Sequence, residues 1–258
     1  MVRKHQATER LSLEAAAARL PQTQAHLDKL LARLERIRPF GPRSMVLDIG
    51  AASGLLLICC ARKGLRAIGV EPWQQAREIA EGLARREGVR ITMLSGRAAA
   101  LPCPAGQFDL VHASSVIEHV EDPQEAFNEA CRVLKPGGIF WFLTASSLCP
   151  RQLEIAGFPC FAWYPDRLKR RIMRWAKARK PHLIGHTDTP AMHWFTPWKA
   201  RRMLRKAGFR RVYDRWDLRG VCEGGRLHGI ALRAVRLCIL TRALADVFVP
   251  ACSYAAVK

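Results

Sequence analysis

The sequence predicts an α/β protein with a doubly wound, mostly parallel sheet of seven strands. Three observations support this class. Apolar runs of strand length alternate with amphipathic runs of helix length from Met45 onwards. The first strand ends at Asp48 and Ile49 and passes through a small-residue turn, 50–54, into a second apolar run. The next strand ends in an acid, Glu71, at about the distance expected of a unit that binds a nucleotide.

Each element follows from its local pattern. An N-terminal helical segment, 1–44, is expected to contain helices within 8–38, with Pro21 in the first turn of the second one. The remainder, 45–258, is one domain with an insertion at 148–195 and an extra amphipathic helix at 227–249. We expect strands at 45–49, 66–70, 90–94, 108–113, 138–144, 209–214 and 251–257, and helices at 54–63, 74–86 and 123–134. In such a sheet, ligands bind beyond the carboxyl ends of the strands.

The composition narrows the class of protein further. A chain of 258 residues is long enough to bury one sizeable core. It has no stretch of about 20 residues without charge, so no spanning helix is expected, and its polar N-terminus lacks a signal-peptide pattern. The nine cysteines include no Cys-x-x-Cys pair. We therefore expect reduced thiols and a cytoplasmic protein.

The formal net charge of +20 is distributed unevenly. Residues 45–145 hold 10 Lys and Arg against 11 Asp and Glu, whereas residues 146–258 hold 23 against 7. The positive charge therefore lies outside the nearly neutral core, 45–145, and mostly in the segment that follows it. This distribution favours binding to an anionic surface or an anionic substrate. A solvated basic face is the alternative.

Five motifs resemble a known family. Residues 46–54 (VLDIGAASG) are similar to the cofactor loop of class I S-adenosylmethionine-dependent methyltransferases, roughly (V/L)-L-D-x-G-x-G-x-G, with Ala52 in place of the middle glycine. Further matches follow in the family's order at 101–111 (LPCPAGQFDLV), 116–123 (VIEHVEDP), 132–138 (RVLKPGG) and 193–209. The resemblance is to the type 11-like subgroup, which methylates small molecules, including quinone and lipid precursors. It implies a Rossmann-like fold.

The resemblance also implies S-adenosyl-L-methionine as the cofactor. Asp48 is expected to brace the turn by accepting backbone N–H bonds, and Glu71 to bind ribose hydroxyls. The family often has an acid after the third strand, but residues 95–100 contain none. Adenine is then held by backbone groups, near Arg97, or by contact with Trp73. The candidate cofactor-binding residues are Asp48, Gly50, Ala52, Gly54, Glu71, Trp73, Arg97 and Ser114.

Methyl transfer from a sulfonium is a direct displacement, so the protein has to align the reactants and exclude water. A general base is needed only if the acceptor begins protonated. His119, just after the fourth strand, is the candidate base, and the alternative is that it only orients its loop. Glu118 is expected to pack or to form local hydrogen bonds. His182, His186 and His193 lack a completing ligand at a usual spacing, so no metal is expected.

The additions bear on the acceptor and partners. The segment 166–180 carries eight Lys and Arg with an apolar stripe that includes Trp175, a pattern typical of an interfacial membrane helix. Binding of RNA phosphates and simple packing on the core are the alternatives. The helix at 227–249 is apolar on more than one side and too charged to span a bilayer. An anionic membrane surface is the expected partner, through Lys169, Arg170, Arg171 and Arg174.

The sequence thus predicts an enzyme that methylates a small or lipid-like molecule, in the cytoplasm or peripherally on the inner face of the membrane. An RNA-modifying methyltransferase and a catalytically silent cofactor-binding protein are the two alternatives.

Overall fold

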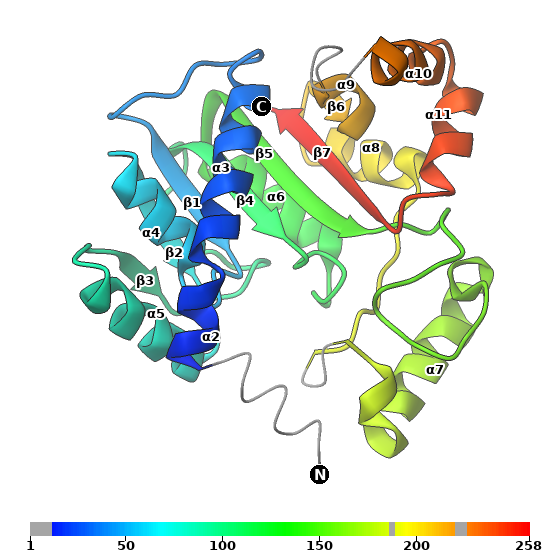
Figure 1. The fold of residues 1–258 in the computed structure, drawn as a ribbon, viewed down its shortest axis with the longest axis horizontal. Helices are drawn as coiled ribbons and strands as arrows, with labels where there is room; N and C mark the ends of the chain where they lie inside the picture. Colours follow the sequence, from blue (N-terminus) through cyan, green and yellow to red (C-terminus); the bar gives the residue numbers. More distant parts are fainter. Residues whose placement is uncertain (1–11, 186–188, 220–225) are drawn as a thin grey trace. The chain divides into compact units, whose positions relative to one another are not determined.

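The computed structural model describes residues 12–185, 189–219 and 226–258 (Figure 1). The chain forms two compact units. Unit 1 consists of Met1–Ser114, Glu125–Trp141 and Val257–Lys258, and unit 2 of Ser115–Gln124 and Phe142–Ala256. Each unit is described by itself below.

The seven strands form one sheet in the order β3-β2-β1-β4-β5-β7-β6, which confirms the predicted fold class. The pairs β1–β2, β1–β4 and β2–β3 are parallel. β7 runs against β5, because Lys258 bonds to Gly138 at one end and Pro250 to Ser146 at the other. The strands are β1 (Met45–Ile49), β2 (Arg66–Val70), β3 (Thr92–Leu94), β4 (Phe108–Ser114), β5 (Leu134–Ala145), β6 (Arg211–Asp214) and β7 (Ala251–Val257).

The helices of unit 1 pack around β1 to β4. α4 is apolar on every side and buries Leu55–Cys60, as a core helix does. α2 starts at the N-cap Ser12, whose side chain accepts the N–H of Ala15, and Pro21 lies in the first turn of α3 as predicted. The helices are α2 (Leu13–Ala18), α3 (Leu20–Leu34), α4 (Leu55–Arg62) and α5 (Gln74–Arg86), with α6 (Pro123–Val133) beginning in unit 2.

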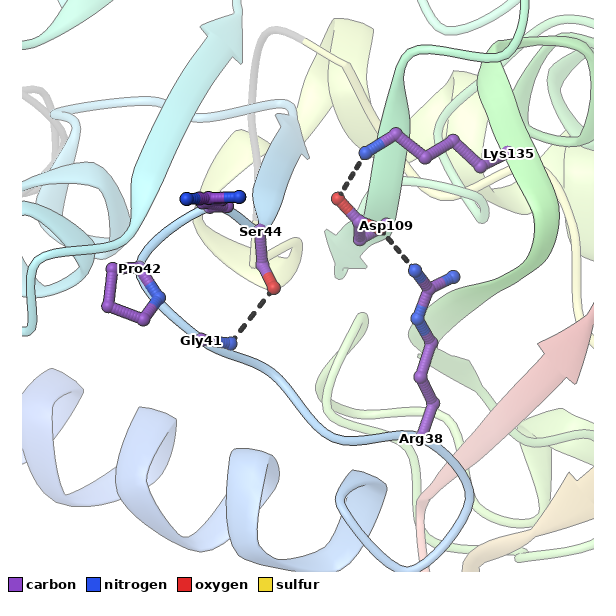
Figure 2. Close-up of a pocket in the computed structure, with 7 residues that line it drawn as sticks. Arg38, Gly41, Pro42, Ser44, Asp109 and Lys135 are labelled. Carbon is purple, nitrogen blue, oxygen red and sulfur yellow. Dashed lines mark hydrogen bonds and ion pairs between the residues drawn. The ribbon is translucent and has the colours of Figure 1, made fainter.

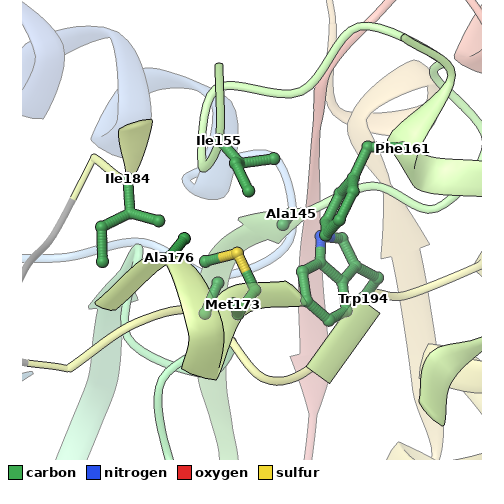
Figure 3. Packing of buried hydrophobic residues seen from close by; sticks show 8 residues of the cluster. Ala145, Ile155, Phe161, Met173, Ala176, Ile184 and Trp194 are labelled. Atoms are coloured by element: carbon green, nitrogen blue, oxygen red, sulfur yellow. The ribbon is translucent and has the colours of Figure 1, made fainter. Parts of the chain in front are cut away.

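Unit 2 contains the insertion, which has its own apolar core. Phe161, Met173, Trp194 and Ile184 are buried together there (Figure 3). The Phe161 and Trp194 rings meet edge to face, with centroids 5.5 Å apart. The helical elements of the unit are η1 (Phe161–Trp163), α7 (Asp166–Arg179), η2 (Pro181–Leu183), α8 (Pro197–Lys206), α9 (Arg215–Leu218), α10 (Arg226–Arg236) and α11 (Ile239–Asp246).

The prediction that four basic residues of α7 face a membrane is wrong for Lys169. Its side chain is buried, with Nζ 2.7 Å from Asp166 Oδ1 and 4.7 Å from the centre of the Trp194 ring. Arg170 is half-buried and donates to the carbonyl of Met192. Both cations therefore stabilise the insertion from within. The side of α7 that carries Lys169 and Arg170 faces the apolar core of the insertion and not solvent. Arg171 and Arg174 are exposed as expected.

The single helix expected at 227–249 is instead two helices, α10 and α11. The break lies at Leu237 and Cys238, where the Cys238 N–H bonds to Thr241 Oγ1 and caps α11. Arg236 ends α10 by donating to the backbone oxygens of Trp216, Asp217 and Arg219. Hydrogen bonds to α9 thus override the continuous helical pattern. No helix in the described ranges is both long and apolar enough to cross a membrane.

Candidate active site

The turn after β1 is held in a conformation that few side chains tolerate. Gly50, Ala52 and Gly54 have φ values of 68°, 46° and 67°, all in the left-handed region. A Cβ on Gly54 would lie 2.8 Å from the Cβ of Ala80, so the tight approach of α4 to α5 also requires glycine here. Ala52 adopts this conformation without being glycine, which stores local strain. The turn leads directly into α4, and the first N–H groups of a helix have no partner within the helix, so such a helix start suits an anionic or polar ligand.

Glu71 braces this turn. Its Oε2 accepts the N–H of Ala52 at 2.9 Å and its Oε1 accepts the N–H of Trp73 at 3.1 Å. Burial raises the pKa of Glu71, and the two N–H donors partly offset the rise. Each carboxylate oxygen keeps a second acceptor position. Glu71 can therefore hold the turn and still accept hydroxyl donors.

The bracing role expected of Asp48 thus belongs to Glu71, and Asp48 has another partner. The Oδ1 of Asp48 lies 2.7 Å from Nδ1 of His112, and both side chains are buried. The carboxylate can only accept, so Nδ1 of His112 carries the proton. The His112 ring also stacks on Trp141, with centroids 4.8 Å apart. His112 is therefore buried and structural, and its link to Asp48 joins two strands and has no signal in the sequence.

The other predicted cofactor residues follow the ends of neighbouring strands in unit 1. β1 lies between β2 and β4, with Ile49 paired to both Val70 and Ala113. The residues that follow these three, including Gly50, Glu71 and Ser114, are therefore brought to one edge of the sheet. Trp73, Arg97 and Ser114 are exposed there. All eight predicted cofactor residues belong to unit 1. This edge fits a nucleotide cofactor, although the individual contacts stay predictions.

The segment after β4 belongs to unit 2 and is organised by Glu118. Its buried carboxylate accepts the hydroxyl of Thr144 at 2.8 Å, and its carbonyl accepts the N–H groups of Met192 and His193. Burial raises the pKa of Glu118 to about 8. The prediction that Glu118 makes local hydrogen bonds was too narrow, because its partners lie in β5 and beyond the insertion.

The candidate base His119 stands next to this anchor. Its N–H donates to the carbonyl of Val116 in the turn, and its side chain is half-buried. A second histidine of unit 2, His193, has its pKa lowered by burial and by repulsion from Arg170 and Lys199. Both effects favour the neutral form of the ring. In the sequence, His193 begins the matched segment 193–209 and is one of three histidines weighed as metal ligands, and neither observation connects it with Glu118, to whose carbonyl its N–H donates.

Metal binding finds no support within the described ranges, where no group of three His, Cys, Asp or Glu side chains is placed to hold an ion. His186, one of the three histidines considered from the sequence, lies outside those ranges.

A pocket of about 510 Å³ opens elsewhere in unit 1, where β1, β4 and β5 begin (Figure 2). Asp109 is its buried centre. It accepts the Met45 N–H at 2.9 Å and pairs with Arg38 at 2.5 Å and Lys135 at 2.7 Å. Asp109 therefore has a structural role, since it joins the start of β1 to β4 and β5. The pocket contains none of the predicted cofactor residues.

Comparisons with known proteins agree with the fold and the turn. A family described as a methyltransferase domain matches residues 47–142. An uncharacterized methyltransferase of Mycobacterium sp. (strain JLS) is 40% identical over 94 residues, which are 36% of each chain. A ubiquinone biosynthesis O-methyltransferase of Rhizobium johnstonii is 30% identical over 130 residues, 50% of this chain and 48% of that one. The solved YcgJ protein from Bacillus subtilis has a TM-score of 0.55 and 19% identity, covering 90% of this chain and 99% of the other, and so supports the fold.

Residues 47–142 therefore resemble the core of a class I S-adenosylmethionine-dependent methyltransferase domain. The resemblance drawn from the motifs is confirmed, and with it S-adenosylmethionine as the cofactor of the class. The chain spans less than half the length of the two curated relatives described above.

Proposed function

We propose that this chain transfers the methyl group of S-adenosylmethionine to a small, lipid-like acceptor. The observation that carries the proposal is the pair of hydrogen bonds by which Glu71 holds the left-handed turn at Ala52. They order a glycine-rich turn and leave acceptor positions on a buried carboxylate at the same edge of the sheet. A nucleoside with vicinal hydroxyls is the ligand that this chemistry suits.

The cofactor supplies an electrophilic methyl group, and the protein has to bind, orient and exclude water. In this proposal Glu71 accepts the ribose hydroxyls, and Trp73 and Arg97 contact the base. His119 takes the proton of the acceptor where the acceptor begins as a phenol or another protonated nucleophile. The buried carboxyl of Glu118 fixes the segment from which His119 projects, through Thr144.

The lipid-like character of the acceptor is supported by two observations. The Rhizobium relative is named as an O-methyltransferase of ubiquinone biosynthesis. The insertion of unit 2 also exposes large apolar side chains, including Trp163 and Trp175. Exposed apolar groups on a basic segment are suited to an apolar substrate or to its membrane.

An anionic membrane surface is the partner that we propose for the insertion, with the chain acting peripherally on the inner face of the membrane. Arg171, Arg174 and Trp175 are exposed on α7, and together they have the chemistry of an interfacial helix. Lys169 and Arg170 act inside the unit. Exposed arginines could equally contact RNA phosphates, which the assay below distinguishes.

The test is to incubate the purified chain with a fractionated cell extract and S-adenosylmethionine carrying a labelled methyl group. We expect label in the lipid-soluble fraction, and we expect His119→Gln to reduce the rate by about a hundredfold or more where the acceptor is a phenol. Label in RNA would establish the RNA-modifying alternative.

Calorimetry with S-adenosylmethionine tests the silent alternative. Binding of the cofactor without label in any fraction would make the chain a cofactor-binding protein, and absence of binding would refute the proposal.

A further inference from the structure

The surface that the proposed function leaves unexplained is the outer face of α11. Leu237, Leu240, Leu244 and Phe248 are between 65% and 84% exposed. Leu240 and Leu244, four residues apart, lie on one side of α11, and Leu237 and Phe248 stand just before its first turn and just after its last. On α10, Ile230 is 64% exposed. We call these five side chains the α11 face.

The opposite side of α11 is polar and points into unit 2. Arg242 Nη1 lies 2.9 Å from Asp214 Oδ2 and 2.9 Å from Asp217 Oδ1. Asp246 Oδ1 accepts the indole N–H of Trp216 at 2.8 Å, and the carboxylate is buried. These bonds fix the rotation of the helix about its axis. The apolar side therefore cannot turn inward without breaking them.

This arrangement is the reverse of a surface helix in water, which buries its apolar stripe and exposes its polar side. Single exposed leucines are common, but five large apolar side chains exposed within residues 230–248 mark a contact surface. The α11 face is thus expected to be covered by an apolar environment when the protein acts.

The charge of the same unit identifies that environment. Residues 146–258 carry 23 Lys and Arg and only 7 Asp and Glu. Of those acids, Asp214 and Asp246 are buried, Asp217 is paired with Arg242, and the exposed Asp166 is paired with Lys169. Two copies of such a surface repel each other, whereas an anionic lipid surface attracts it.

Exposed indoles agree with a lipid environment. Trp163, Trp175 and Trp198 are all exposed in unit 2. Tryptophan favours the boundary between headgroups and acyl chains, where its ring is apolar and its N–H remains hydrated.

We propose that the α11 face inserts into the interfacial layer of an anionic bilayer, while Arg242 and Asp246 keep α11 attached to unit 2. The inference rests on the proposed membrane partner and deepens it, since it assigns the inserted apolar contact to α11, beside the exposed arginines and indole of α7. It does not require methyl transfer.

The experiment uses the full chain and extruded vesicles of phosphatidylcholine and phosphatidylglycerol in equal parts, with pure phosphatidylcholine vesicles for comparison. We expect co-sedimentation with the mixed vesicles. The double variant Leu240→Gln, Leu244→Gln should reduce the partition coefficient about tenfold or more, because two apolar side chains are lost from the contact. The matched control Leu153→Gln removes an equally exposed leucine outside α11 and should change binding less than twofold.

Insertion itself is measured with an environment-sensitive fluorophore on Cys238, the exposed cysteine at the start of α11. Hydrogen bonds from Thr241 lower the pKa of this thiol and so assist labelling at that position. To restrict labelling to Cys238, the exposed Cys160 is replaced by serine, and so is Cys222, which lies outside the described residues. The emission should shift to the blue when mixed vesicles are added, but not when RNA is added.

Three results would overturn the proposal. These are equal binding by the double variant and the wild type, no emission shift on vesicles, and a dimer in vesicle-free sedimentation that the double variant dissociates. The last would make a second copy the occupant of the α11 face. None of them depends on methylation, so failure of the methyl-transfer proposal would be recognised separately, by the labelling assay.

Discussion

Replacing Gly54 by alanine tests the claim that close packing shapes the cofactor turn. Gly54 and Gly64 have nearly the same left-handed backbone, with φ values of 67° and 70°. A Cβ on Gly54 would lie 2.8 Å from the Ala80 Cβ and 3.2 Å from Ile91 Cδ1, whereas a Cβ on Gly64 would meet nothing within 4 Å. The two substitutions share the backbone cost, and only the first adds an overlap.

The expected magnitudes follow from these distances. An L-residue in the left-handed region costs about 1–2 kcal/mol, offset by about 0.4–1 kcal/mol from the restricted unfolded chain. Gly64→Ala should therefore lower the free energy of unfolding by about 0.5–1 kcal/mol. Overpacking adds about 1–3 kcal/mol, so Gly54→Ala should cost about 1.5–4 kcal/mol. At about 2–4 °C per kcal/mol, the Tm of Gly54→Ala should fall by several degrees more.

The assay is urea and thermal unfolding followed by circular dichroism. Adding Ala80→Gly to each variant removes the atom that the new Cβ would meet. The double variant with Gly54→Ala should be about 1 kcal/mol or more stable than the sum of the two single effects predicts. The double variant with Gly64→Ala should show no such coupling. Equal losses in the two alanine variants, or no coupling to Ala80, would refute the packing argument.

Four further predictions concern single side chains. Ala52→Gly should raise the free energy of unfolding by about 0.5–1 kcal/mol, because strain relief outweighs the added chain entropy, and a lower urea midpoint would contradict this. Glu71→Gln should weaken S-adenosylmethionine binding about 10- to 100-fold in calorimetry, since one N–H loses its acceptor, whereas the exposed Glu78→Gln should bind normally. Burial raises the pKa of Glu118 to about 8 from an ordinary 4.5, so the folded chain keeps a proton that the unfolded chain loses. Stability should fall from about pH 4.5 to about pH 8, by at most about 1.4 kcal/mol per unit, and Glu118→Gln should flatten the slope of unfolding free energy against pH. Lys169→Ala should cost about 2–4 kcal/mol and leave vesicle binding unchanged, and reduced binding by a folded variant would return this cation to the membrane surface.

Local patterns proved sufficient for much of unit 1. β1, β2 and α5 have the predicted bounds, because an apolar run closed by a small-residue turn and a 3.6-residue stripe are properties of neighbouring residues. β7 also has its predicted bounds, 251–257. β5 begins four residues earlier than expected, at Leu134, since it pairs with the end of β7 across the 135–138 turn. Pairing partners that are distant in sequence are what local patterns omit.

The candidate site divides in the same way. Glu71 was identified from its spacing to the turn, because a strand–helix–strand unit has a nearly fixed length. The link between Asp48 and His112, and the bonds from Glu118 to Thr144, Met192 and His193, depend on strands and loops far apart along the chain. No spacing rule connects them.

The sequence by itself determined the fold class, the resemblance to a methyltransferase domain and the position of the cofactor edge. Turn residues, the alternation of strands and helices, and the spacing of motifs are all local properties that can be read directly from the order of the residues. Only the tertiary structure decided which side of each added helix meets water. On α7, the buried Lys169 contacts Trp194 and Asp166. On α11, Arg242 pairs with Asp214 and Asp246 accepts from Trp216, and Leu240 and Leu244 are left exposed to solvent. Helical periodicity gives two sides but not their directions, since those depend on which ion pairs and hydrogen bonds the rest of the chain supplies.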